Sequence, residues 1–180
     1  MAAITTPPEL DLAIHVPANV WENIFQRVGV LQLLEFRLIC RSWRGIVDGS
    51  PALMNRICIK FPPGFALDRD YEPDYLVPAR NLTLEKVRIS AVNTWWPTFA
   101  QRLVFVSIND CTVSCSTLLQ LLQPMTNLRV LQLGKLQMWK SSKVAVNFQM
   151  KQVETFSAEG LSEDIFSFLA PIFTQLRRIG

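Results

Sequence analysis

The chain has 180 residues, of which 18 are lysine or arginine, 15 are aspartate or glutamate and 49% are hydrophobic. This near balance of charge argues against a nucleic-acid-binding protein, which requires a concentrated basic patch, and the hydrophobic content excludes bulk disorder. The charged fraction of 18% lies below the roughly 25% usual for soluble domains. We therefore expect some apolar surface that another protein covers.

Cysteine and histidine usage restricts the chemistry that the chain can support. Cys40, Cys58, Cys111 and Cys115 form no CxxC pair and no disulfide-rich spacing, which predicts a reducing compartment, the cytoplasm and/or the nucleus. A single histidine, His15, excludes most zinc sites built from cysteine and histidine, and it argues strongly against a cysteine–histidine or serine–histidine nucleophilic site. The sequence has no signal-peptide pattern and no apolar run near the roughly 20 residues of a membrane span. We expect no catalytic residue, no metal, no cofactor and no membrane partner.

The first folded segment is predicted to be a module of three short helices, after a flexible tail at 1–15. Pro17 suits the first turn of a helix, where its missing N–H costs nothing, and Gly29 is expected to end that helix. Two adjacent apolar rows run along this helix, with Val20, Ile24 and Val28 in one and Trp21 and Phe25 in the other.

A second helix is predicted from Leu31 to Val47. One apolar row has Leu34 and Leu38, and another has Phe36, Ile39, Cys40, Trp43, Ile46 and Val47. The row of Arg37, Arg41 and Arg44 is interpreted as a solvated face rather than a phosphate site. Ser50 is expected to cap a third helix with Pro51 at its first position. Because about 40 residues cannot bury apolar side chains on several faces, a leftover face is expected to bind a protein partner.

The stretch Val16–Phe25, followed by Leu33-Leu34 and by Arg37–Arg44, resembles the F-box motif over residues 16–54. The resemblance implies that the helical module, placed at 16–60, docks onto the Skp-type adaptor of a cullin ubiquitin ligase. Carried over by position, it implies an adaptor-binding interface and supporting core made of Pro17, Ile24, Leu34, Leu38, Ile39, Cys40 and Trp43. The sequence leaves open which of these residues lie at the interface and which lie in the core.

Residues 61–78 contain four prolines and a cluster of acidic residues and are predicted to be a linker without regular structure. After it, the pattern of Leu103, Val106, Ile108 and Cys111 fits the leucine-rich pattern L-x-x-L-x-L-x-x-N/C. Related patterns start near 79, 103, 128, 153 and 176, so successive starts lie 24, 25, 25 and 23 residues apart. The segment 79–180 therefore resembles leucine-rich repeats, which implies an α/β chain with parallel strands and helical or irregular returns.

Strand alternation sends the leucine-type positions into the core and the intervening side chains to the opposite, concave face. Solenoids bind partners on that face, so it is the predicted substrate-binding surface: Thr83, Glu85, Phe105, Ser107, Val130, Gln132, Thr155 and Ser157. The last repeat is incomplete, which predicts that the chain is a fragment or short form of a longer repeat protein.

Together, these patterns resemble the F-box/leucine-rich-repeat class of substrate receptors in SCF-type (Skp–cullin–F-box) ubiquitin ligases. The resemblance implies a non-catalytic adaptor that binds a Skp-type protein, through it a cullin, and a protein substrate. Two alternatives are an F-box protein that acts outside a ligase and a non-catalytic leucine-rich-repeat scaffold. An enzyme is disfavoured because the sequence shows no cluster of titratable groups.

Overall fold

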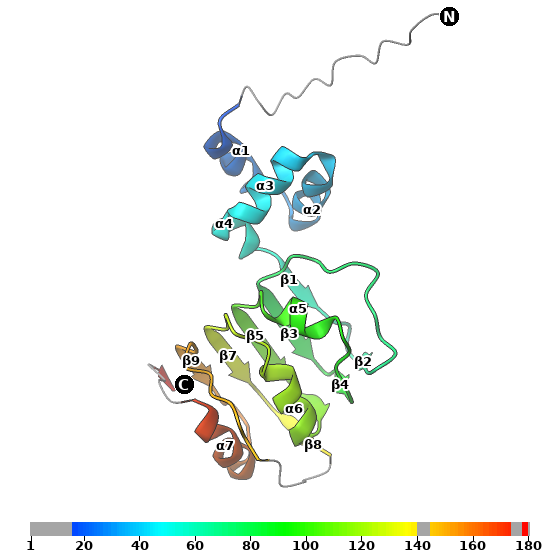
Figure 1. Ribbon diagram of the computed structural model, residues 1–180, viewed down its shortest axis with the longest axis vertical. Coiled ribbons are helices and arrows are strands. Elements are labelled where there is room, and N and C mark those ends of the chain that lie inside the picture. Colours follow the sequence, from blue (N-terminus) through cyan, green and yellow to red (C-terminus); the bar gives the residue numbers. More distant parts are fainter. Residues whose placement is uncertain (1–15, 140–144, 174–177, 180) are drawn as a thin grey trace, which may run out of the picture. The chain divides into compact units, whose positions relative to one another are not determined.

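A computed structural model describes residues 16–139, 145–173 and 178–179. The predicted tail at 1–15, with His15, and the last predicted repeat start at Leu176 lie outside the described residues. The chain divides into two compact units, Met1–Arg56 and Ile57–Gly180. Each unit is treated by itself (Figure 1).

The first unit contains four helices, which are α1 (Ala18–Phe25), α2 (Val30–Ile39), α3 (Arg41–Gly49) and α4 (Pro51–Met54). The helix expected over 31–47 is therefore wrong, because Cys40 has an extended backbone (φ −151°, ψ 164°) that separates α2 from α3. The Cys40 thiol accepts a hydrogen bond from the Trp43 amide at 3.4 Å, so it caps α3. The apolar spacing in the sequence continues across this break because α2 and α3 pack against the same core.

The ends of α1 also differ from the prediction. Pro17 precedes the helix as its cap residue instead of lying in its first turn. Gly29 does not end α1, which stops at Phe25, and instead precedes α2, where the Gln32 side chain accepts a hydrogen bond from the Gly29 amide at 3.2 Å. The predicted cap of the last helix is confirmed, since the Ser50 hydroxyl accepts from the Leu53 amide at 3.2 Å.

Four aromatic rings form the centre of this unit. Trp43 lies 4.7 Å from Trp21, 5.3 Å from Phe25 and 5.3 Å from Phe36, measured between ring centroids. The Arg56 guanidinium donates to backbone carbonyls at the end of α1, including that of Phe25 at 2.8 Å. These carbonyls have no partner within their own helix, so Arg56 ties the end of the unit to its beginning.

The second unit is built from two parallel sheets. The six-stranded sheet has the order β1-β3-β5-β7-β9-β10 and the four-stranded sheet the order β2-β4-β6-β8. The strands are β1 (Cys58–Lys60), β2 (Ala66–Leu67), β3 (Asn81–Glu85), β4 (Arg88–Ile89), β5 (Phe105–Asn109), β6 (Cys111–Val113), β7 (Val130–Leu133), β8 (Leu136–Met138), β9 (Thr155–Ser157) and β10 (Arg178–Ile179).

The register of the larger sheet repeats at the spacing found in the sequence. Asn81 pairs with Phe105, Phe105 with Val130 and Val130 with Thr155. The described returns include α5 (Trp96–Ala100), α6 (Cys115–Leu122), α7 (Glu163–Leu169) and a 3-10 turn at Ala170–Ile172. Figure 1 shows α5, α6 and α7 on one side of the sheet. The chain is thus mixed α/β, with helices first and parallel sheets after them.

Two predicted boundaries differ from the structure. Cys58–Lys60, expected in the helical module, form β1 and pair in parallel with β3. The expected linker at 61–78 contains β2, which pairs with β4. Gly64 makes this strand possible because its φ of +81° turns the chain and its amide donates to the Lys86 carbonyl at 2.8 Å. Prolines on either side therefore do not prevent a short strand.

The core of the second unit lies between the larger sheet and the helices. Every second strand residue is fully or almost fully buried, as the sequence predicts: Leu82, Leu84, Val106, Ile108, Leu131, Leu133 and Phe156. On the helix side, Leu118, Leu121 and Leu122 of α6 are buried, and the Trp96 indole donates to the Leu121 carbonyl at 2.9 Å. The alternate strand side chains are left on the opposite face.

Candidate functional site

The first unit exposes apolar side chains on its helices. In α1, Trp21 and Phe25 face the aromatic core, while the neighbouring row of Val20 and Ile24 is 42% exposed at both positions. In α2, Leu33 is buried. The side chains on the other side of α2 remain open: Leu31 (76% exposed), Leu38 (70%) and Ile39 (61%). We call these five exposed residues of α1 and α2 the helical apolar face.

The structure separates the residues predicted for adaptor binding by their burial. Pro17, Ile24, Leu38 and Ile39 are exposed and Leu34 is partly exposed. Cys40 is the cap of α3, and Trp43 packs among three other rings. The surface positions can therefore contact a partner directly, whereas Cys40 and Trp43 support the fold beneath them.

Sequence reasoning missed Val20 and Leu31 as members of this face. Val20 was identified as part of an apolar row without a statement about its exposure. Leu31 lies three and seven residues before Leu34 and Leu38, the spacing of one helix face. That spacing was the available signal.

The Arg37 side chain is engaged in an ion pair and is not simply part of a solvated basic row. Its Nε and second guanidinium nitrogen donate to the two carboxylate oxygens of Asp48 at 2.6 and 3.0 Å. The Arg44 side chain in turn donates to the Arg37 carbonyl at 3.4 Å. This two-pronged geometry joins α2 to α3. It therefore holds the helix that carries most of the helical apolar face.

The second unit presents the predicted substrate surface on its larger sheet. The register aligns Thr83, Ser107, Gln132 and Ser157 in one row across β3, β5, β7 and β9. A second row contains three more predicted residues, Phe105, Val130 and Thr155. Glu85 pairs with Asn109 at the ends of β3 and β5. The eight predicted residues are all exposed or partly exposed, so strand pairing places them on one face.

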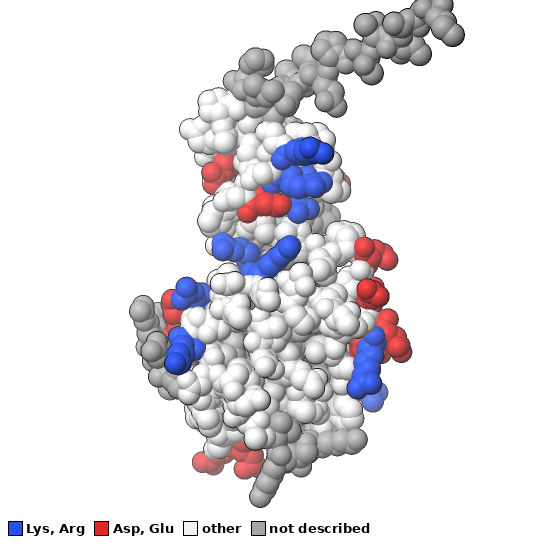
Figure 2. All heavy atoms as spheres, viewed as in Figure 1, with Lys and Arg blue, Asp and Glu red and all other residues white. Residues whose placement is uncertain are grey.

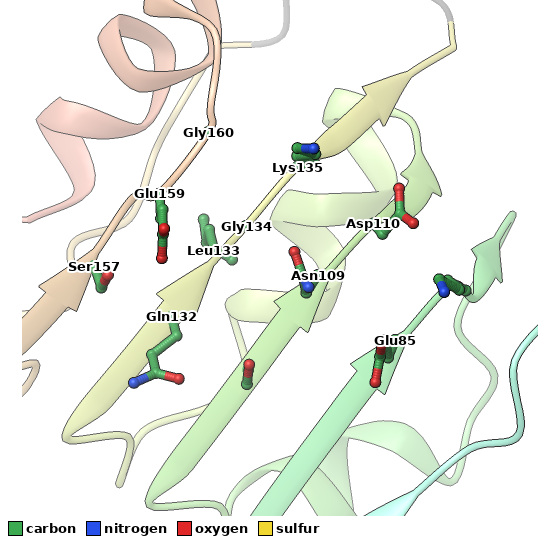
Figure 3. A pocket seen from close by; sticks show the side chains of 12 residues that line it. Glu85, Asn109, Asp110, Gln132, Leu133, Gly134, Lys135, Ser157, Glu159 and Gly160 are labelled. Carbon is green, nitrogen blue, oxygen red and sulfur yellow. The ribbon is translucent and has the colours of Figure 1, made fainter.

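A cavity of about 690 Å³ lies where these strands end, and we call it the strand-end pocket. Four of the predicted residues line it, namely Glu85, Ser107, Gln132 and Ser157 (Figure 3). The other four, Thr83, Phe105, Val130 and Thr155, do not line it. The remaining lining residues are Lys86, Asn109, Asp110, Leu133, Gly134, Lys135, Glu159 and Gly160.

Sequence reasoning missed the lining residues that follow the strands, because the repeat pattern was used only to assign the faces of strand residues. Lys86 and Asp110 occupy left-handed backbone positions, with φ of 55° and 53°, directly after β3 and β5. Gly134 approaches Asn109 so closely that a Cβ at this position would lie 1.9 Å from the Asn109 side-chain oxygen. The sequence did contain an indication of this pocket, because charged residues follow several successive strands.

The strand-end pocket combines charges of both signs with amide and hydroxyl groups. Glu85, Asp110 and Glu159 supply carboxylates, and Lys86 and Lys135 supply ammonium groups. Within the described ranges, no group of three or more histidine, cysteine, aspartate or glutamate residues is arranged to hold a metal ion. Such a lining offers hydrogen bonds and ion pairs to a polar polypeptide segment.

Cys111 is the first residue of β6, directly after the lining residue Asp110, and its side chain is buried. Burial raises the pKa of the Cys111 thiol, with a smaller contribution from the Asp110 carboxylate. The thiol donates to the Leu84 and Asn109 carbonyls at 3.4 and 3.3 Å. A buried, protonated and hydrogen-bonded thiol is a packing residue and a poor nucleophile.

None of the described helices is both long and apolar enough to cross a membrane.

Comparison with known families identifies the first unit. Residues 14–53 match the family model described as the F-box domain, which covers α1 to α3 and most of α4. F-box domains bind Skp-type adaptors and act as ubiquitin ligase adaptors through that contact, and F-box proteins are typically non-catalytic. A comparison with curated proteins found no match to the chain.

Proposed function

We propose that this protein is a substrate-recognition adaptor of an SCF-type ubiquitin ligase in the cytoplasm and/or the nucleus. Its F-box domain binds the Skp-type adaptor, and through it a cullin, by means of the helical apolar face. The observation that carries this proposal is the coincidence of the F-box match at 14–53 with Leu31, Leu38 and Ile39 left 61–76% exposed. Burying one such side chain in an interface contributes about 1.5–3 kcal/mol, so a partner that covers this face gains substantially.

For the second unit we propose a leucine-rich-repeat solenoid. The support is the 24- to 25-residue spacing between paired strand residues, from Asn81 to Phe105, Val130 and Thr155, which lies within the 20–29 residues of such repeats. The predicted surface row and the strand-end pocket then hold the protein substrate. Glu85, Ser107, Gln132 and Ser157 belong both to the predicted substrate-binding surface and to the pocket lining, which makes them the proposed substrate contacts.

The adaptor-binding step can be tested by placing two positive charges on the helical apolar face. In the Leu31→Lys/Leu38→Lys variant, each lysine lies three or four residues from Glu35, so opposite charges support α2. The same charges are costly in an apolar interface because they must be desolvated. We expect at least a thirtyfold loss of affinity for a purified Skp-type adaptor, measured by calorimetry, as for a hot spot of about 2 kcal/mol or more.

A matched control adds the same two charges elsewhere. Gln101→Lys/Gln120→Lys alters exposed side chains of the second unit and is expected to retain wild-type affinity and the same melting temperature. If the Leu31/Leu38 variant is folded and binds the adaptor as the wild type does, the proposed interface is wrong. Wild-type protein that does not bind the adaptor contradicts the ligase role itself and favours an F-box protein acting outside a ligase.

A further inference from the structure

A second cavity in the Ile57–Gly180 unit is lined largely by aromatic rings. It has a volume of about 290 Å³, and its rings belong to Phe61, Phe65, Tyr71, Tyr75, Trp95 and Phe99. Phe61, Phe65, Tyr71 and Trp95 are only partly buried, and Tyr75 is 73% exposed. We call it the aromatic pocket. Since large aromatic side chains are normally packed away from water, this much open ring surface indicates a binding site.

The rings of the aromatic pocket hold one another in a defined arrangement. The Tyr71 ring lies 5.8, 5.0 and 5.7 Å from the rings of Phe61, Phe65 and Trp95, at interplanar angles of 77°, 87° and 78°. Edge-to-face contacts of this kind are the favoured geometry of aromatic pairs. The Trp95 indole also donates to the Tyr71 carbonyl at 3.0 Å. The pocket is therefore preorganised before any partner arrives.

Acidic side chains alternate with the lining residues along one wall. In the segment 70–75, Tyr71, Pro73 and Tyr75 line the pocket, and each is preceded by an exposed acidic residue: Asp70, Glu72 and Asp74. Figure 2 shows acidic side chains gathered at the edge of the molecule where this loop runs. Neither ion pair found among the described side chains, Arg37–Asp48 and Arg129–Glu154, uses these carboxylates. Lys60 is the one charged residue within the lining itself.

The Asp68 carboxylate fixes the start of this wall. It accepts hydrogen bonds from the Asp70 and Tyr71 amides at 3.0 and 3.2 Å. This turn holds the Tyr71 ring towards the pocket while the neighbouring carboxylates stay in solvent. Three exposed carboxylates, against the single exposed guanidinium of Arg69 in the same segment, thus border the aromatic cavity.

We propose that the aromatic pocket binds a basic segment of a partner protein, with an arginine side chain lying against the rings. The faces of aromatic rings attract cations, and arginine makes such contacts most often. The rim carboxylates supply the complementary charge. A proline-rich segment also docks on aromatic surfaces, but it gives the rim carboxylates nothing to pair with. This site does not depend on the proposed ligase role, because no residue of the helical apolar face or of the strand-end pocket takes part.

The test uses the full chain and a short fluorescent peptide of alternating glycine and arginine, with binding measured by anisotropy. We expect binding that weakens with added salt, because the rim charges are exposed. Tyr75→Ala removes an exposed ring without disturbing the ring contacts given above, and should lower affinity about two- to fivefold, the value of a surface cation–π contact. Asp70→Asn/Glu72→Gln/Asp74→Asn should lower it about threefold or more.

A charge-matched control separates the rim from net charge. Glu35→Gln/Glu163→Gln/Asp164→Asn removes three exposed carboxylates elsewhere and is expected to bind the arginine peptide as the wild type does. A glycine–proline peptide of equal length should bind more weakly than the arginine peptide. The proposal is overturned if the proline peptide binds better, if the control lowers affinity as much as the rim variant, or if the arginine peptide does not bind. Loss of Skp-type adaptor binding with retained peptide binding would overturn only the ligase role.

Discussion

The four cysteines differ in their access to solvent, and this sets their reactivity. Cys58 is exposed, Cys40 and Cys115 are partly buried and Cys111 is buried. Because thiolates are the reacting species, a thiol whose pKa is raised by burial stays protonated and unreactive to a higher pH than an ordinary thiol. The fold itself therefore protects Cys111.

We predict that iodoacetamide at pH 8 modifies Cys58 first and leaves Cys111 unmodified until the protein is unfolded. At pH 9 Cys111 should still be unmodified in the native protein, because burial shields its thiol from the reagent and raises its pKa. Peptide mass spectrometry after timed quenching measures each site, and denatured protein is the control. Equal rates at both sites in the native protein would contradict the buried position of Cys111.

Among the helices, the decisive distinction is between side chains that support the fold and those that contact a partner. Trp43→Ala removes the ring that touches Trp21, Phe25 and Phe36. We expect it to destabilise the first unit by about 2–4 kcal/mol, somewhat less than the roughly 3–5 kcal/mol of a fully buried tryptophan. Urea unfolding followed by circular dichroism gives this free energy.

Leu38→Ala is the matched comparison, because the Leu38 side chain is 70% exposed. We expect Leu38→Ala to change the free energy of unfolding by no more than about 0.5 kcal/mol. Its main effect should be to weaken adaptor binding. Should Leu38→Ala destabilise the unit as much as Trp43→Ala, the separation of the two roles would be incorrect.

Elements with a long apolar period could be predicted from the sequence, and short ones could not. The strands β3, β5, β7 and β9 and the helices α6 and α7 follow repeated spacing, so their order and buried residues were predictable. The break between α2 and α3 at Cys40 does not interrupt the apolar spacing of residues 31–47, so the sequence pattern could not reveal it. The strands β2 and β4 have two residues each and lie outside the part of the repeat pattern that was followed, so the second sheet could not be anticipated.

The candidate sites show the same limit at the scale of the whole molecule. Their strand residues could be predicted, because alternation assigns each side chain to a face. Most of the charged lining of the strand-end pocket comes from turns after the strands, at Lys86, Asp110, Lys135 and Glu159, where strand alternation no longer assigns a side chain to a face. The aromatic pocket draws on a segment that reads as an unstructured linker. Both pockets thus draw much of their lining from segments where the local sequence pattern is weak.

Because the helical apolar face and the strand-end pocket belong to different units, changes at the two surfaces should act separately. We predict that Gln132→Arg/Ser157→Arg retains Skp-type adaptor binding and loses substrate proteins, whereas Leu31→Lys/Leu38→Lys does the reverse. Affinity purification of both variants and the wild type, with quantitative mass spectrometry, measures both losses, and the combined variant should lose both sets. Adaptor loss in the Gln132/Ser157 variant, with its fold intact, would contradict the assignment of the two roles to separate units.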